Sequence, residues 1–89
     1  MDVLKVDVEG FEEEVLRGAR ALLRDPDRRP RAVFVEVHPF AWSRTGTTSD
    51  SLLNELRASG YVVRHLDGRP VGTLDKWEEV VATPSDGVR

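Results

Sequence analysis

The stretch Val3–Gly10 constrains the fold more than any other part of the chain. Apolar and charged residues alternate along it, the apolar ones at Leu4, Val6 and Val8 and the charged ones at Lys5, Asp7 and Glu9. This alternation is typical of a β-strand, and a helical pattern begins directly after the final glycine. Because a strand that leads directly into a helix is the first half of a βαβ unit, the sequence predicts an α/β fold with parallel strands.

Three charged side chains on one face of such a strand need an explanation, because parallel strands are normally buried on both faces. Lys5, Asp7 and Glu9 either form the solvated face of an edge strand or belong to a binding site at its carboxyl end. Open α/β sheets bind their ligands at that end. The charges cluster towards the turn at Gly10, which favours a binding site.

A helical pattern runs from about Phe11 to Arg24. Its predicted buried side consists of the apolar residues Phe11, Val15, Ala19, Leu22 and Leu23. The first turn holds three glutamates at 12–14, where their charge suits the helix dipole, so we expect them on a solvated face. Gly18 lies inside this pattern, and a close approach of the helix to the sheet would explain a glycine there.

A second strand is predicted at Ala32–Val35, because this continuous apolar run suits a central and buried position. The polar segment 25–31, which contains two prolines, separates the strand from the preceding helix. A long irregular loop at 38–48 follows the strand and carries Phe40 and Trp42. These aromatic side chains either line a binding pocket or fold back onto the core, and the sequence leaves both alternatives open.

The second half of the chain predicts one more helix and two strands. The helix begins near residues 48–51, which offer N-capping side chains, and it ends at Gly60. Its predicted buried residues are Leu52, Leu53 and Leu56. Strands follow at 61–63 and 77–82, and the short link between them indicates that the last one is antiparallel. The order is β-α-β-α-β-β, with a partial domain at 1–84 and a tail at 85–89.

Composition excludes several classes of function. The net charge is −3 and no basic stripe is interleaved with aromatic residues, so nucleic-acid binding has no electrostatic support. The chain contains no cysteine, which excludes disulfides and cysteine-based metal sites. No apolar run approaches the roughly 18 residues that a membrane span needs, and the first residues lack the layout of a signal peptide. We therefore expect a cytoplasmic protein without nucleic-acid or membrane partners.

Several motifs resemble those of the FkbM-type methyltransferases. Segments 5–12 (KVDVEGFE) and 15–19 (VLRGA) are similar to the family's KxDxEGxE…vLxGa signature. Segment 35–39 (VEVHP) is similar to its EvHP segment, and 56–61 to its L…Gy segment. The resemblance covers most of the chain up to about Leu66. It implies an enzyme that depends on S-adenosylmethionine and methylates hydroxyl groups of sugars, polyketides or related metabolites.

The resemblance also implies a fold, the carboxyl-terminal half of a Rossmann-like class I methyltransferase sheet. In that sheet the last strand inserts antiparallel between the two before it. The cofactor-binding half would precede the position of Met1, and no Gly-rich G-x-G-x-x-G or G-x-G-x-G turn occurs here. We therefore expect a fragment that is inactive in isolation and whose S-adenosylmethionine site lies mostly outside it. Its first strand should have an open edge that permits self-association.

Two adjacent parallel strands would bring Asp7, Glu9, Glu36 and His38 to one rim of the sheet. Methyl transfer to a hydroxyl requires a positioned acceptor oxygen and is helped by a general base. His38 suits that role by its ordinary pKa, and a rim carboxylate competes with it. The predicted catalytic residues are Asp7, His38 and Glu36, and the predicted cofactor-binding residues are Glu9 and Gly10.

Other roles at this rim stay open. Oxygen ligands beside one imidazole could hold Mg²⁺ or Mn²⁺, although the sequence alone assigns no metal ligand. His38 is alternatively a hydrogen-bonded structural histidine, and Glu9 alternatively caps the following helix. We expect Lys5 to neutralise the rim carboxylates and His65 to be a surface residue without companions.

The predicted function is O-methylation of a small metabolite or saccharide hydroxyl by part of an S-adenosylmethionine-dependent methyltransferase. A rival from another class is a catalytically inert half-domain that pairs through its open edge with itself or with a partner. A free-standing metal-binding domain is a third alternative. Cofactor binding by the isolated chain favours the enzyme, and a stable dimer without cofactor affinity favours the interaction module.

Overall fold

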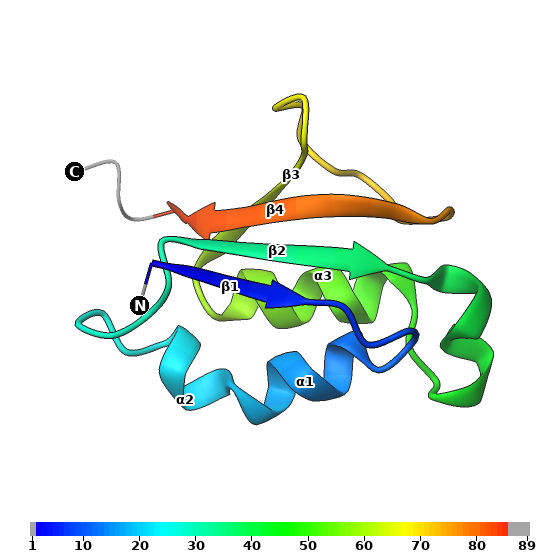
Figure 1. The fold of residues 1–89 in the computed structure, drawn as a ribbon, viewed down its shortest axis with the longest axis horizontal. Helices are drawn as coiled ribbons and strands as arrows, with labels where there is room; N and C mark the ends of the chain where they lie inside the picture. The colour runs from blue at the N-terminus through cyan, green and yellow to red at the C-terminus, as the bar shows by residue number, and fades with distance from the viewer. Residues whose placement is uncertain (1, 86–89) are drawn as a thin grey trace.

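A four-stranded sheet forms the frame of the computed structural model, which describes residues 2–85. Its strands are β1 (Val3–Val6), β2 (Ala32–Val37), β3 (Tyr61–His65) and β4 (Glu78–Pro84). They lie in the order β1-β2-β4-β3, with β1 parallel to β2 and β4 antiparallel to both of its neighbours. β1, β2 and β3 therefore run in the same direction. The carboxyl ends of β1 and β2 lie at the same edge of the sheet (Figure 1).

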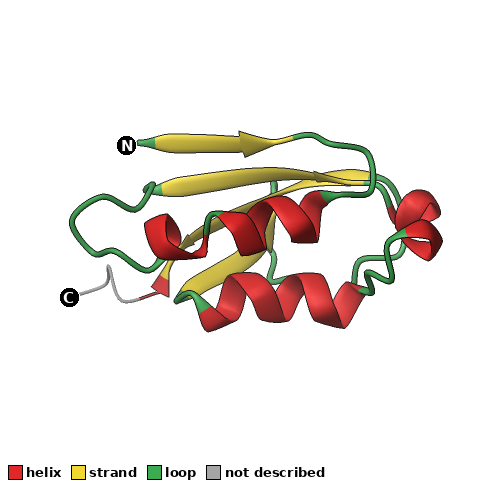
Figure 2. Cartoon of the chain, turned by 90° about the horizontal axis from the view of Figure 1, so that it is seen from below, coloured by secondary structure: helices red, strands yellow, loops and turns green. Residues whose placement is uncertain are grey.

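Helical segments connect these strands. α1 (Glu12–Gly18) and α2 (Arg20–Leu23) lead from β1 to β2, the 3₁₀ helix η1 (Pro39–Arg44) follows β2, and α3 (Ser49–Ala58) leads to β3. α1, α2 and α3 all lie on one face of the sheet (Figure 2). The predicted α/β class is confirmed, in the form of a small fold with a mixed sheet. Among the described residues, no helix has the length and apolar character that crossing a bilayer requires.

The core lies between the sheet and these helices. Three valines of β2 point into it and are fully buried together with leucines of the helices: Val33, Val35, Val37, Leu16, Leu23, Leu52, Leu53 and Leu56. The intervening Phe34 and Glu36 are only half-buried. β2 is therefore central, as predicted, but its second face is less covered, because the described helices pack on one side of the sheet.

The first helical segment differs from the prediction in its length and in its buried side. The predicted helix 11–24 is interrupted at Ala19 and forms α1 and α2. Phe11 and Val15, predicted to be buried, are 55% and 38% exposed, whereas Glu12 and Leu16 are completely buried. Phe11 and Val15 face solvent because hydrogen bonds hold the Glu12 carboxylate inside the protein.

Gly18 does not mark a close approach of helix and sheet. It is exposed at the last position of α1, and a Cβ added there would meet no atom within 4 Å. The predicted packing role of this glycine was therefore wrong. A glycine at the end of a helix costs less stability than one in its interior, which is why the position tolerates it.

α3 begins and ends as the sequence predicts. Thr48 Oγ1 accepts a hydrogen bond from the Ser51 backbone N–H at 3.0 Å, and Ser51 Oγ accepts one from the Thr48 N–H at 2.8 Å. These two bonds form a capping box, which satisfies two backbone donors at the start of the helix. The three leucines predicted to face the core are buried, and Gly60 follows the helix with a φ of 86°.

β1 lies at an edge of the sheet. Within residues 2–85 it pairs with β2 alone, so its outer backbone groups face no other strand. The sequence predicts an open edge on the first strand, and the described residues show one. Such an edge is a template for pairing with another chain, but self-association of this protein stays a prediction.

A largely buried carboxylate ties the first helical segment to α3. Glu55 is 8% exposed, and its two carboxylate oxygens accept hydrogen bonds from the Arg20 guanidinium at 2.9 Å each. The bidentate bond to Arg20 lowers the pKa of the Glu55 carboxyl below its ordinary value, against the opposing effect of burial.

We predict that this contact stabilises the fold at neutral pH and ceases to do so in acid. Because the pKa of Glu55 is lower in the folded chain than in the unfolded chain, its contribution is present above the unfolded value and disappears as the pH falls through the folded value. The free energy of unfolding in urea should be lower for Glu55→Gln than for the wild type at about pH 7, and the difference should shrink towards about pH 3. A stability difference between the wild type and Glu55→Gln that stays constant over this pH range would contradict a stabilising contact between ionised Glu55 and Arg20.

Candidate functional site

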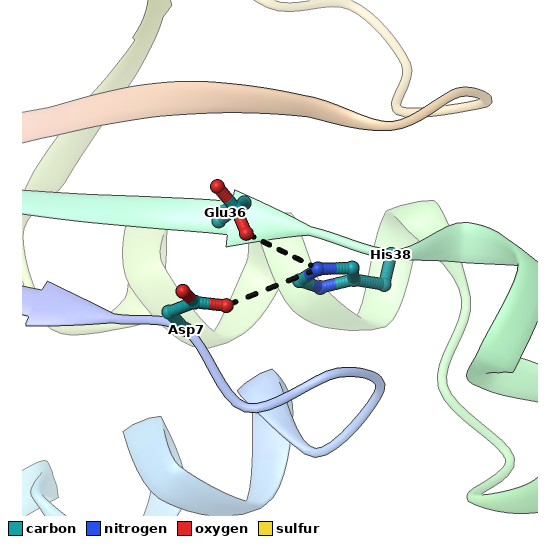
Figure 3. A group of neighbouring side chains, drawn as sticks. All are labelled: Asp7, Glu36 and His38. Carbon is teal, nitrogen blue, oxygen red and sulfur yellow. Dashed lines mark ion pairs between the residues drawn. The ribbon is translucent and has the colours of Figure 1, made fainter.

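Three of the four predicted rim residues meet at the carboxyl edge of the sheet. Asp7 follows β1, Glu36 lies near the end of β2, and His38 comes directly after that strand. His38 Nε2 lies 3.3 Å from Glu36 Oε1 and 3.9 Å from Asp7 Oδ1 (Figure 3). The parallel pairing of β1 and β2 is what brings them together, because both strands end at the same edge.

Glu9, the fourth predicted rim residue, lies in the turn after Asp7. Its φ of 36° is left-handed, and its side chain is exposed. The N-cap of α1 is Phe11, and no side chain caps this helix. The capping alternative for Glu9 was therefore wrong, and its binding of a cofactor stays a prediction.

Gly10 shapes the turn that leads into α1. Its φ is 101°, and a Cβ on this residue would lie 2.7 Å from the Cβ of Ala41 in η1, so a larger residue does not fit. Its carbonyl oxygen accepts a hydrogen bond from Thr45 Oγ1 at 3.2 Å. Gly10 thus sets how closely the start of α1 approaches η1; a direct contact of this residue with a cofactor stays a prediction.

The carboxylate of Glu12 is the buried centre of the site, so its predicted place on a solvated face was wrong. Oε2 accepts a hydrogen bond from the Gly10 N–H at 2.7 Å and lies 2.9 Å from His38 Nδ1. Oε1 accepts a hydrogen bond from Trp42 Nε1 at 2.7 Å. Backbone and indole N–H groups can only donate, so Glu12 accepts as a carboxylate. These charge-assisted bonds offset the cost of burying the charge.

The contact with Glu12 fixes the orientation of His38, whose side chain is 5% exposed. We assign the ring proton to Nδ1, which donates to the Glu12 carboxylate, and Nε2 then faces the two rim carboxylates. Burial lowers the pKa of His38, but the hydrogen bond and charge of Glu12, together with the charges of Glu36 and Asp7, outweigh burial and raise the pKa overall.

The two aromatic residues of the loop after β2 have different places. Trp42 is 5% exposed and belongs to the core, as one of the two alternatives predicts, and its indole holds Glu12. Phe40 is 70% exposed, and its ring meets the His38 ring edge to face, with centroids 5.9 Å apart. Phe40 therefore stands on the surface beside the buried imidazole.

Two expectations about charged neighbours were wrong. Lys5 Nζ pairs with Glu79 Oε2 at 3.4 Å instead of with a rim carboxylate. His65 has a companion, because its Nδ1 lies 2.6 Å from Glu78 Oε2. Both partners come from the start of β4, and the pairs form because β4 lies between β2 and β3.

Glu12 is the residue of this site that sequence reasoning missed. Three successive glutamates at a helix start suit the helix dipole, and this pattern gives no reason to place one of them inside. The available signal was the EGxE part of the family signature, which sets this glutamate, two residues after Gly10, apart from its two neighbours.

We predict that Glu12→Gln lowers the free energy of unfolding by about 3 kcal/mol or more. The NH₂ group of the glutamine would face one of the three N–H groups that now donate to the carboxylate. The His38 imidazole would also lose its buried charge partner. The matched control is Glu14→Gln, an exposed position in the same helical turn, which should change stability by less than about 0.5 kcal/mol. Equal stability of the two variants, measured by urea unfolding and tryptophan fluorescence, would contradict the role of Glu12.

Comparison with known proteins identifies a family. A family model described as the Methyltransferase FkbM domain matches residues 1–63, which is more than half of the chain, and the match covers only part of that domain. No curated protein and no solved structure matches the chain. The matched segment contains the whole group formed by Asp7, Glu12, Glu36 and His38. On this match, the chain belongs to the FkbM methyltransferase domain family.

Proposed function

We propose that the domain represented by this chain transfers a methyl group from S-adenosylmethionine to a hydroxyl of a small metabolite or saccharide. In this proposal Asp7, Glu36 and His38 bind the hydroxyl and promote loss of its proton. The observation that carries it is the arrangement of these groups: a buried imidazole, held from behind by Glu12, presents Nε2 towards two accessible carboxylates.

The chemistry explains why such a group is needed. The methyl group passes from the sulfonium to the acceptor oxygen, the donor leaves as S-adenosylhomocysteine, and the hydroxyl proton must go elsewhere. Most of the catalysis is alignment of the oxygen with the methyl group. A rim group that removes the proton contributes further, typically about 10²- to 10⁴-fold.

The solvent exposure of the rim side chains supports their proposed contact with the acceptor. The Asp7 side chain is 51% exposed and that of Glu36 22% exposed, so both can contact a ligand, whereas the Glu12 side chain is 0% exposed and can act only through His38. Open α/β sheets bind ligands at the carboxyl ends of their strands, which is where Asp7 and Glu36 lie.

The proposed cofactor site extends beyond the residues described here. Glu9 is exposed two residues after Asp7 and could reach a ribose hydroxyl, and Gly10 shapes the backbone directly after it. The Gly-rich turn that usually holds the rest of such a cofactor is not among the 89 residues. The test of the function therefore uses the protein encoded by the complete reading frame.

We predict that His38→Asn lowers kcat by about 10²- to 10⁴-fold with little change in the affinity for S-adenosylmethionine. Asparagine can still donate to Glu12 from the position of Nδ1, but it lacks a group at the position of Nε2. The assay follows the tritiated methyl group of S-adenosylmethionine into a panel of hydroxyl acceptors. Products that survive mild alkali are ethers rather than esters, which identifies O-methylation of hydroxyls.

The matched control is His65→Asn, which removes the other histidine, itself paired through Nδ1 with a glutamate. This variant should keep wild-type activity. Methyl transfer by His38→Asn at the wild-type rate would contradict the proposed role of the rim, and absence of methyl transfer to every hydroxyl acceptor would contradict the proposed function.

A further inference from the structure

We propose that Asp7, Glu36 and His38 bind a divalent metal ion. This inference rests on the proposed function for the role of the ion, but not for its binding. The three residues offer one imidazole nitrogen and two carboxylate oxygens, all within 4.8 Å of one another. Among residues 2–85 this is the one group of three or more such side chains with ligand atoms so close together.

The distances suit a shared ion. His38 Nε2 lies 3.3 Å from Glu36 Oε1 and 3.9 Å from Asp7 Oδ1. Ligand atoms bound at about 2.1 Å from one ion are separated by roughly 3 to 4 Å, so the ion could enter with small side-chain movements. Figure 3 shows the two carboxylates directed towards the same side of the imidazole.

A second observation concerns the buried side chain that points into this group. Nδ1 of His38 is committed to Glu12, so Nε2 is the ring nitrogen that faces the two carboxylates. Two carboxylates thus lie on the Nε2 side of the ring and Glu12 on the Nδ1 side, and a cation bound beside Nε2 would balance the charges of the first two. A histidine held from behind by a buried carboxylate is also the usual arrangement of metal-binding histidines, because the carboxylate fixes the ring and strengthens the ligand.

A proton on Nε2 is the competing cation, and it matches the geometry less well. The separation of 3.9 Å between Nε2 and Asp7 Oδ1 is too long for a hydrogen bond, so a proton on Nε2 would pair with Glu36 and leave Asp7 without a direct bond. A divalent ion would contact both carboxylates and balance both charges. The neighbouring cation, Lys5, is paired with Glu79 instead.

The chemistry of the ligands selects a class of ion. Carboxylates suit Mg²⁺ and Mn²⁺, and an imidazole ligand suits ions of the first transition row, so Mn²⁺ is a suitable probe. Three protein ligands leave open positions, as catalytic metal sites require. An acceptor hydroxyl bound at such a position would lose its proton to water more readily, and His38 would act as a metal ligand rather than as the base.

The test measures Mn²⁺ binding to the chelator-stripped chain by electron paramagnetic resonance, which detects the free ion. We expect one Mn²⁺ per chain. Asp7→Asn and His38→Asn should each weaken Mn²⁺ binding at least about 100-fold. Substitution of a residue that only hydrogen-bonds to a metal ligand typically weakens binding about 10- to 100-fold. Asp7 is half-exposed, so its variant should fold, which circular dichroism checks. His65→Asn is the control and should bind Mn²⁺ as the wild type does.

Two outcomes would overturn the proposal: no binding at about millimolar Mn²⁺, or binding that neither Asp7→Asn nor His38→Asn weakens. Methyl transfer in excess chelator separates the two proposals. Activity that persists there and still depends on His38 would overturn the role of the ion in methyl transfer while supporting the proposed function. One Mn²⁺ bound at the three residues, in a protein that methylates no hydroxyl, would support the metal site and overturn the function.

Discussion

The buried carboxylate of Glu12 is the interaction on which the rest of the site depends. An ionised carboxylate without partners would be far too costly in a core of this size, and here three N–H groups satisfy it. The donors come from the turn before α1, from the residue after β2 and from η1. The Glu12 carboxylate therefore connects the turn that follows β1 to the residues that follow β2.

This arrangement couples the stability of the fold to the geometry of the site. The bonds that keep Glu12 satisfied also orient the His38 ring, so that Nδ1 faces Glu12 and Nε2 faces the rim. The parallel pairing of β1 with β2 then supplies Asp7 and Glu36 on the outer side. The imidazole is thus held from the inside by the fold, and its Nε2 faces the carboxylates of Asp7 and Glu36 at the rim.

Local sequence patterns predict the helices and strands of this fold better than they predict its buried polar contacts. The α/β class, the cap of α3 and its buried leucines follow from spacing and side-chain type, because each involves residues that are close in sequence. The grouping of Asp7, Glu36 and His38 also follows, since parallel strands end at one edge. The buried face of α1 does not, because the partners of Glu12 include residues 26 and 30 positions away. Lys5 and His65 likewise find partners on β4, which only the strand order reveals.

The most direct test of this account is the protonation state of the His38 ring in solution, read from long-range ¹H–¹⁵N correlations of the folded chain. We expect a proton on Nδ1 that exchanges slowly with solvent, because it is buried against Glu12, together with a strongly shifted indole proton of Trp42. A ring protonated on Nε2 alone, with a bare Nδ1, would contradict the central claim that Glu12 orients this histidine.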